Sequence, residues 1–450
     1  MTLEEQVKFL LEENAFLKKT IQILEKRIAD LEDIILKSQV YKNSSNSSKP
    51  PSTDISSPKR NQSLRESSGN KPGGQLGHKG TTLQMSSTPD EIIELNPTCC
   101  ENCGCSLENE VSYLEVKRQE IDIPPIQAII KEYRRNSKNC PECGHHQEIE
   151  FPKHIINNIQ YGPNIESLVS YLSVYQYLPF RRLKELVNHL FNLGISEGTI
   201  DNLLRRMSKK ALPVYEQIKE SISLSKQVGS DETSAKVNGE KQWIWVWQSV
   251  RSTFLTASES RGSKTIDSIF PDGLINSILN TDRWAAQLKT KTAGHQLCIS
   301  HLQRDLNFIE EVDNIDWAKR FKVLLKKALE LKKQLSEYSH SHPATMELEQ
   351  RVDILLQENI PKNTYHKTYS FQKSLIKHRD SILTFLYNKD TPADNNGSER
   401  AIRNVKVKQK ISGQFKTGQN RFCVLRSIID TCKKRNIDIM VGLNYIAHSY

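Results

Sequence analysis

The stretch Gln227-Val-Gly-Ser-Asp-Glu-Thr decides the fold of this chain, because it opens a strand-rich region and carries Asp231 inside the first expected strand. Two more strands are expected after it. Trp243-Ile-Trp-Val-Trp and Thr253-Phe-Leu-Thr-Ala are rich in the aromatic and β-branched side chains that favour strands. A short helix is then expected around residues 263–270.

A second acid, Asp282, closes the apolar run Leu274-Ile-Asn-Ser-Ile-Leu-Asn-Thr, which predicts a fourth strand. The order strand, strand, strand, helix, strand is the one with which an RNase H-like nuclease core begins. In that arrangement the first and fourth strands lie side by side, and adjacent strands are about 4.8 Å apart. We therefore expect Asp231 and Asp282 to lie close enough to share metal ions.

A third acid, Glu399, follows the turn-like Pro392-Ala-Asp-Asn-Asn-Gly-Ser and opens a basic helix. Asp394 in that turn is the alternative candidate for the third acid. It is ranked below Glu399 because it precedes the helix. A carboxylate trio can hold two Mg²⁺ ions for in-line attack on a DNA phosphate, although a chain with 53 acidic residues offers many trios of solvated carboxylates. The predicted catalytic and magnesium-binding residues are Asp231, Asp282 and Glu399.

Residues 400–435 hold eleven lysines or arginines and one acid. On the helix that Glu399 opens, basic residues recur at offsets of four, seven and eleven, which places them near one face. Such a face suits DNA phosphates, although a plain solvated helix would also explain the charge. The predicted DNA contacts here are Arg400, Arg403, Lys406 and Lys410.

The composition fits a soluble multidomain α+β protein, since 37% of residues are hydrophobic, 26% are charged, and the length of 450 suggests about three domains. A net charge of +10 favours a polyanionic partner, nucleic acid ahead of an anionic membrane, over a basic protein without one. No run of about 18 apolar residues occurs, and the acidic N-terminus does not resemble a signal peptide. We therefore expect a cytoplasmic protein that does not enter a membrane.

Residues 1–40 carry a heptad repeat, which predicts a parallel two-stranded coiled coil that forms a homodimer or a higher oligomer. Asn14 at a core position is typical of sequences that specify the register of a dimer. The alternative is a single amphipathic helix packed on its own domain. Residues 41–90, rich in Ser, Asn, Pro, Gly and Lys, predict a flexible basic linker. The repeat consists of Leu3, Leu10, Leu17, Leu24 and Leu31, alternating with Val7, Asn14, Ile21, Ile28 and Ile35.

Residues 91–155 contain two matching knuckles, Cys100-Glu-Asn-Cys-Gly and Cys140-Pro-Glu-Cys-Gly. Four thiolates suit a closed, structural Zn²⁺ site, and unligated surface cysteines are the alternative. The 36 residues between the pairs predict a small β-rich module with a β insert over residues 111–134. The predicted ligands are Cys100, Cys103, Cys140 and Cys143, and possible substitutes are Cys99, Cys105, His145 and His146.

Residues 156–222 are helical in pattern and contain a candidate helix-turn-helix, with Gly194 in the turn and Ser196 or Thr199 as the cap of the second helix. Arg205 and Arg206 on that helix are predicted phosphate contacts, although many ordinary helical hairpins look the same.

The catalytic core is expected in two parts, residues 223–300 and 391–450, interrupted by a helical insertion over residues 301–390. Near the junction, Cys298-Ile-Ser-His is either a metal-binding pair or a structural one.

These motifs together resemble the IS66 family of bacterial insertion-sequence transposases, which belong to the DDE class. The resemblance runs over nearly the whole chain. It includes the coiled coil, both cysteine knuckles, Gly73-Gly-Gln-Leu-Gly-His-Lys-Gly, Leu178-Pro-Phe-Arg-Arg and, most specifically, Pro392-Ala-Asp-Asn-Asn-Gly-Ser-Glu-Arg-Ala-Ile-Arg. It implies that Asp231, Asp282 and Glu399 are the DDE acids.

The resemblance also implies an activity: metal-dependent cleavage at the ends of a mobile element, followed by attack of the freed 3′-OH on target DNA. The implied partners are double-stranded DNA and accessory proteins encoded by the same element, in the bacterial cytoplasm at the nucleoid. Two alternatives come from other classes. One is a zinc-containing dimeric DNA-binding regulator derived from an inactive transposase, and the other is a coiled-coil scaffold.

Overall fold

The structure is a computed structural model that describes residues 3–39, 43, 46–47, 77–78, 80, 83–124 and 126–449. It is a mixed α/β protein whose main feature is a five-stranded sheet flanked by helices. No helix in these ranges is long and apolar enough to cross a membrane.

The five-stranded sheet has the order β5-β4-β3-β6-β7. The first three strands in the chain pair antiparallel, while β6 and β7 run parallel to β3. The first and fourth strands of the sheet are therefore neighbours, as expected. The strands are β3 (Gln227–Val237), β4 (Glu240–Gln248), β5 (Thr253–Ser258), β6 (Leu274–Thr281) and β7 (Thr292–Leu297).

Aromatic residues at alternate positions build the core of this sheet. Trp245 and Trp247 on β4 are buried and stack with ring centroids 5.5 Å apart, and Phe254 on β5 packs beside Trp247. Two short helices join the strands: α5 (Ser263–Ile269) before β6 and α6 (Ala285–Leu288) after it. The predicted helix at 263–270 is thus confirmed.

A set of helices precedes the sheet: α2 (Pro163–Ser170), a π-helical turn (Tyr171–Tyr175), α3 (Phe180–Phe191) and α4 (Glu197–Ser223). The Ser196 side chain caps α4, because its oxygen accepts the Thr199 N–H at 3.0 Å. Gly194 lies in the turn between α3 and α4, as expected, and the left-handed residue that ends α3 is Asn192, with φ 51°.

The segment expected to be a helical insertion consists of α7 (Ile299–Asp313), α8 (Asp316–Gln334), α9 (Pro343–Gln357) and α10 (His366–Lys377), followed by the 3₁₀ turns Arg379–Ser381 and Thr384–Leu386. These helices have a core of their own. Trp317 and Phe321 on α8 and Phe371 on α10 are buried in it, so the insertion is stabilised apart from the sheet.

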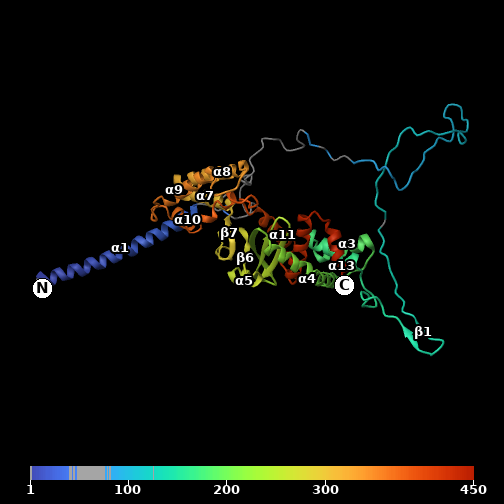
Figure 1. Cartoon of the computed structure of the whole chain (residues 1–450), viewed down its shortest axis with the longest axis horizontal. Helices are drawn as coiled ribbons and strands as arrows, with labels where there is room; N and C mark the ends of the chain where they lie inside the picture. The colour runs from blue at the N-terminus through green and yellow to red at the C-terminus, as the bar shows by residue number, and fades with distance from the viewer. Residues whose placement is uncertain are drawn as a thin grey trace.

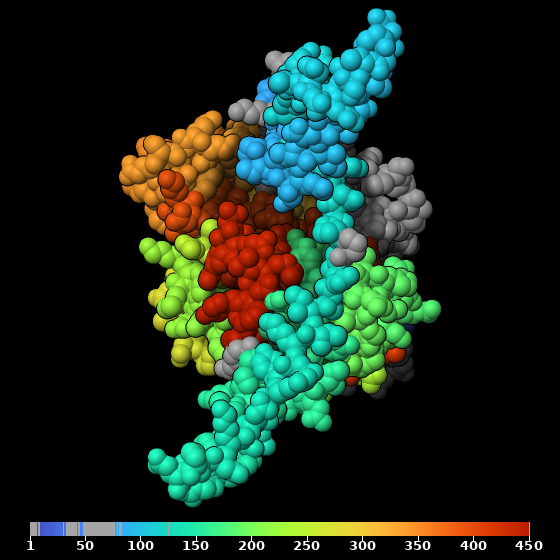
Figure 2. All heavy atoms as spheres, turned by 90° about the vertical axis from the view of Figure 1, so that its right-hand side faces the viewer, coloured from blue at the N-terminus to red at the C-terminus, as the bar shows by residue number. Residues whose placement is uncertain are grey.

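The chain ends in α11 (Asn396–Ser412), α12 (Gln419–Lys434) and α13 (Ile439–His448). α11 packs on β3 and β4, and α12 packs on β5 and α4. In Figure 2 these C-terminal helices (red) lie between the insertion helices (orange) and the helices that precede the sheet (green).

The N-terminal helix α1 (Leu3–Gln39) projects away from the rest of the molecule (Figure 1). Its heptad side chains are half exposed or more wherever they are described, with Leu10 at 60% and Ile21 at 53%. The apolar stripe is therefore not covered by the described part of this chain, which weighs against the alternative of a helix packed on its own domain.

Residues 83–124 and 126–162 form a long arm with little regular structure (Figure 1), apart from a hairpin of β1 (Ser137–Asn139) and β2 (His146–Glu148). The predicted β insert is wrong, because residues 111–124 and 126–134 contain no strand. Their apolar side chains are exposed, Val111 and Ile130 at 93% each. Strands need partner strands and a buried face, and this segment has neither.

Candidate active site

Asp231 on β3 and Asp282, the residue directly after β6, lie at matching heights of two neighbouring parallel segments. Gly229 on β3 pairs with Asn280 on β6, and each aspartate stands two residues further along the chain. Because side chains alternate along a strand, the two carboxylates project from the same face of the sheet. Neighbouring strands are about 4.8 Å apart, so the carboxylates are close neighbours.

Glu399 reaches the same place from the first turn of α11, and two asparagines tie that turn to the sheet. The Asn395 side chain donates to the Ser230 carbonyl at 2.6 Å. The Asn280 side chain donates to the carbonyls of Pro392, at 2.7 Å, and of Asp394, at 3.0 Å. These bonds fix the start of α11 beside β3 and β6.

Gly229 permits this close approach. A Cβ atom added to it would lie 2.6 Å from Asn395 Oδ1 and 2.7 Å from Ser398 Oγ, which is closer than real side chains come. The Asp394 side chain instead turns back and accepts the Asn396 N–H at 3.1 Å. Of the two candidates for the third acid, Glu399 is the one whose charge is felt by Asp231.

The acids share a poorly solvated environment. The pKa of Asp231 is raised well above its usual range, first by burial and then by the negative charges of Asp282, Glu232 and Glu399. Burial also raises the pKa of Asp282, against the opposing effect of the Trp284 N–H, which donates to it at 2.9 Å. Both aspartates keep some exposed surface, although desolvation dominates their shifts. A small cation can therefore reach them.

Glu232 is a further buried acid, which the sequence motifs do not mark as a site residue. It accepts hydrogen bonds from Arg261 and Gln287, each at 2.6 Å. Burial raises its pKa, and the Arg261 charge opposes that effect. The Arg261 guanidinium also lies 3.7 Å from the centre of the Trp284 ring, so it braces the segment after Asp282. Nothing in the sequence pairs Glu232 with Arg261, which is 29 residues away.

Helix α7 supplies two further neighbours of Glu399. Arg304 donates to its carboxylate at 3.2 Å, and His301 Nε2 lies 3.8 Å away. Burial, with the charge of Arg304, lowers the pKa of His301 to about 3, so this imidazole is neutral at physiological pH. The only sequence signal for His301 and Arg304 is that both closely follow Cys298, in the segment after the predicted acid Asp282.

Cys298 has a structural role in this geometry. Its sulfur accepts the Asn395 N–H at 3.2 Å, and burial raises the pKa of its thiol to about 12. A buried thiol of this kind is a poor metal ligand, because the thiolate is the ligating form. Of the two interpretations of Cys298-Ile-Ser-His, the geometry favours a contact that holds the turn before α11.

Three parts of the chain match family models. Residues 158–420, more than half of the chain, match the model of the IS66 transposase family. The chain belongs to the IS66 transposase family. Residues 97–144 match the zinc-finger binding domain of IS66 transposases, and residues 2–84 match a family of unknown function. No curated protein matches the chain.

The zinc-finger domain of this transposase contains two knuckles of the same shape. Gly104 and Gly144 both have φ 73°, and their N–H groups donate to the carbonyls of Cys100, at 2.8 Å, and Cys140, at 2.9 Å. Backbone N–H groups that point at the sulfur lower the pKa of both of these cysteines. Each knuckle is therefore prepared to present a thiolate to zinc.

The three acids and the four cysteines are ligand types that Mg²⁺ and Zn²⁺ prefer, but their side chains are not yet arranged around a metal position. Across the described residues, no three His, Cys, Asp or Glu side chains already stand in a metal-binding arrangement. Carboxylate oxygens are the ligands that Mg²⁺ prefers, and four thiolates are the set that a structural Zn²⁺ prefers. In this structure Arg304 occupies one oxygen of Glu399.

The predicted phosphate contacts differ in how exposed they are. Arg400, Arg403 and Lys410 on α11 are exposed. Lys406 Nζ instead donates to the Ser234 carbonyl at 2.9 Å, and burial lowers its pKa. This lysine holds α11 on β3.

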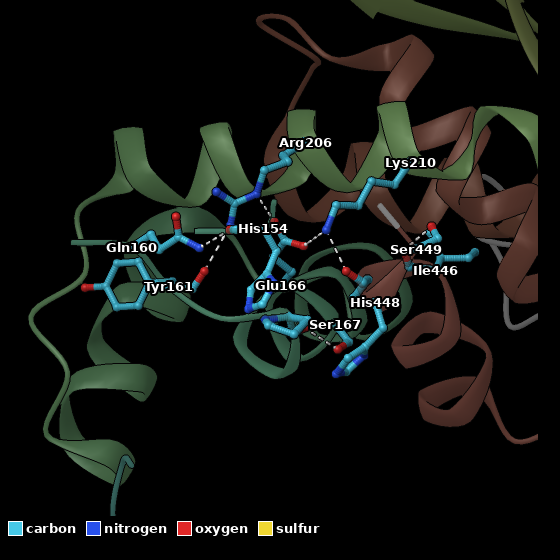
Figure 3. A network of polar contacts seen from close by, with 12 residues as sticks. His154, Gln160, Tyr161, Glu166, Ser167, Arg206, Lys210, Ile446, His448 and Ser449 are labelled. Carbon is cyan, nitrogen blue, oxygen red and sulfur yellow. Dashed lines mark hydrogen bonds and ion pairs between the residues drawn. The ribbon is translucent and has the colours of Figure 1, made fainter. Parts of the chain in front are cut away.

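The same contrast holds on α4. Arg205 is exposed and pairs with Asp201 at 3.0 Å. Arg206 forms an ion pair with Glu166, which is 1% exposed, and also donates to the Tyr161 carbonyl at 3.1 Å. Lys210 donates to the second oxygen of Glu166 at 3.0 Å (Figure 3). Arg206 therefore joins α4 to α2 through a buried carboxylate.

Proposed function

We propose that this IS66-family transposase is a DDE enzyme that cleaves the ends of an insertion sequence and joins the freed 3′-OH to target DNA. The single observation that carries the proposal is that Asp231 and Asp282 lie at matching positions of adjacent parallel chain segments, with Glu399 near enough for its charge to raise the pKa of Asp231. The strand order β5-β4-β3-β6-β7, with three antiparallel and two parallel members, supports an RNase H-like core.

The three carboxylates would hold two Mg²⁺ ions, which supply an activated attacking oxygen and neutralise the charge that develops on the phosphate. Desolvation would make these acids strong ligands, because they gain more from a cation than solvated carboxylates do. Glu399 would exchange Arg304 for metal, which leaves the Arg304 cation beside the phosphate. His301 stays neutral and would orient the Glu399 carboxylate without competing for it.

Exposed cations would position the DNA backbone. Arg400, Arg403 and Lys410 follow Glu399 on α11, so a strand that reaches the acids would pass along this helix. We also propose α3 and α4 as a helix-turn-helix that binds the element ends, with Arg205 as a phosphate contact. The internal bonds of Arg206 and Lys406 favour a positioning role for both.

Two modules would complete the assembly. The exposed heptad stripe of α1 supports a parallel coiled coil that pairs two protomers, as the joining of two element ends requires. The ligands Cys100, Cys103, Cys140 and Cys143 would close a structural zinc site. The proposal divides the chain into seven parts, with boundaries after residues 40, 90, 155, 222, 300 and 390. It also includes accessory proteins encoded by the same element and a location at the nucleoid.

Strand joining in vitro tests the function. Purified protein and Mg²⁺ would be incubated with labelled element ends and a supercoiled target. Wild type should give joined product, Glu399→Gln should give none, and the control Glu259→Gln, an exposed acid on the loop after β5, should match wild type. Equal product from Glu399→Gln would remove this residue from the mechanism. Salt-sensitive binding to the ends without joining by any variant would point to the regulator.

A further inference from the structure

A basic cavity lies beside the candidate active site, between α6 and α10. Its volume is about 640 Å³, and its walls carry Arg283, Lys289, Lys362, Lys373 and Lys377 together with Tyr369. The described residues that line it include no Asp or Glu. Four of these five positively charged residues are lysines.

These lysines are not neutralised by the fold. Within the described part of the chain, none of Lys289, Lys362, Lys373 and Lys377 forms an ion pair. Lys373 and Lys377 stand one helical turn apart, where like charges destabilise a helix. By contrast, Lys322 on the neighbouring α8 pairs with Glu310 at 2.7 Å. The repulsion on α10 would be relieved by an anion in the cavity.

Arg283 connects the cavity to the acids. It directly follows Asp282, pairs with Asp305 on α7, and lies 4.4 Å from the centre of the Phe371 ring on α10. These contacts hold its guanidinium at the wall of the cavity. His378 lines the same cavity, and its pKa is lowered first by burial and then by the charges of Lys377 and Arg283. The local field is therefore positive.

We propose that this cavity binds a single-stranded segment of the DNA next to the phosphate that is cut, through backbone contacts without sequence preference. A volume of about 640 Å³ is that of a site for one small molecule, so it admits a nucleotide or two and excludes a duplex. Lysines for phosphates and a tyrosine ring for a base are the usual parts of a single-strand site. The inference rests on the proposed function, which places a DNA strand at Asp282.

The test compares two double variants that each remove two positive charges. Lys373→Gln/Lys377→Gln changes the cavity, and Lys326→Gln/Lys327→Gln changes exposed lysines on α8 that form no ion pair in the described residues. Binding would be measured against salt, without Mg²⁺, for a duplex with a single-stranded 3′ extension and for the same duplex with blunt ends. The cavity variant should lower the salt slope for the extended duplex by about 1.4, since each single-strand phosphate contact contributes about 0.7.

The blunt duplex and the α8 variant should keep wild-type slopes. Equal losses on both probes, or no loss on either, would overturn the proposal. Lys289→Gln on the opposite wall should give about half the effect, and it keeps the test valid if the α10 variant does not fold. Because binding is measured without Mg²⁺, it is independent of strand joining. A Glu399→Gln protein that still joined strands would reject the proposed function and leave the slope result unchanged.

Discussion

The proposed magnesium site of the sheet and the proposed zinc site of the knuckles differ in how the fold prepares them. Asp231, Asp282 and Glu399 span 168 positions of the sequence, yet strand pairing and the Asn395 and Asn280 bonds bring their backbone segments together. The four cysteines span only 43 positions, but they lie outside the packed core. In the described residues neither set stands in a finished metal-binding arrangement. Only the acids are supported by a packed core, so the cysteine module should depend more on its metal to complete its fold.

Removal of zinc should therefore have the largest effect, confined to one part of the chain. Structural zinc contributes roughly 10 kcal/mol or more to the folding of small modules. Chelation should expose residues 97–144 to protease while a fragment from about residue 158 onward stays intact, because the sheet core does not include the knuckles. Limited proteolysis with mass spectrometry would check this. Cleavage spread over the core would contradict the independence of the two regions.

Asp231→Asn should abolish activity at the proposed magnesium site without unfolding the protein. Strand joining should fall by roughly 10³-fold or more, as expected when a member of a catalytic set is removed. The metal-free protein should gain stability, because a buried charge beside Asp282 and Glu232 is lost. Melting with and without Mg²⁺ measures both effects: wild type should be stabilised by Mg²⁺ and the variant should not. Asp272→Asn, on an exposed turn before β6, is the control.

The next prediction concerns the close contact between the start of α11 and Gly229 on β3. Gly229→Ala would place a Cβ against Asn395 and Ser398, and such overpacking costs about 1–3 kcal/mol. Gly294→Ala on β7 is a matched control, because the nearest atom to its Cβ is an Ile278 carbon at 3.9 Å. Urea unfolding would compare the two. An unchanged midpoint for Gly229→Ala would mean that Asn395 does not hold the helix in place.

The smallest expected effect is a pH dependence of metal affinity. The native pKa of Asp231 and of Asp282 is raised above 3.8, so the folded protein binds more protons than the unfolded chain from pH 4 upward. Metal-free stability should fall as pH rises through that window. Mg²⁺ affinity should rise over the same window, by up to about tenfold per pH unit, because the cation displaces a proton. A flat titration series would contradict the shared, desolvated site.

Local patterns predicted most elements around the acids. Aromatic and β-branched runs indicated β4 and β5, the apolar run before Asp282 indicated β6, and of the two predicted caps of α4, Ser196 and Thr199, the structure has Ser196. The β insert at 111–134 was wrong because alternating apolar residues do not form a strand without a partner.

The partners of the site residues depend on tertiary packing and carry no local signal. Arg206 and Lys406 looked like phosphate contacts from charge and helical spacing, but one pairs with buried Glu166 and the other with a strand carbonyl. Arg304 beside Glu399 joins elements 95 residues apart, and the lysines around Arg283 come from the residue after α6, the turn before α10 and α10 itself. Only the packed structure brings such residues together.

Metal-directed cleavage of the protein tests the central claim most directly. Fe²⁺ bound in place of Mg²⁺, with ascorbate and peroxide, cuts the backbone next to the metal. We predict cuts near Asp231, Asp282 and Glu399 in one sample, all lost together in Asp231→Asn. Cuts at only one of the three positions, or cuts unaffected by Asp231→Asn, would contradict a single metal site built from these acids.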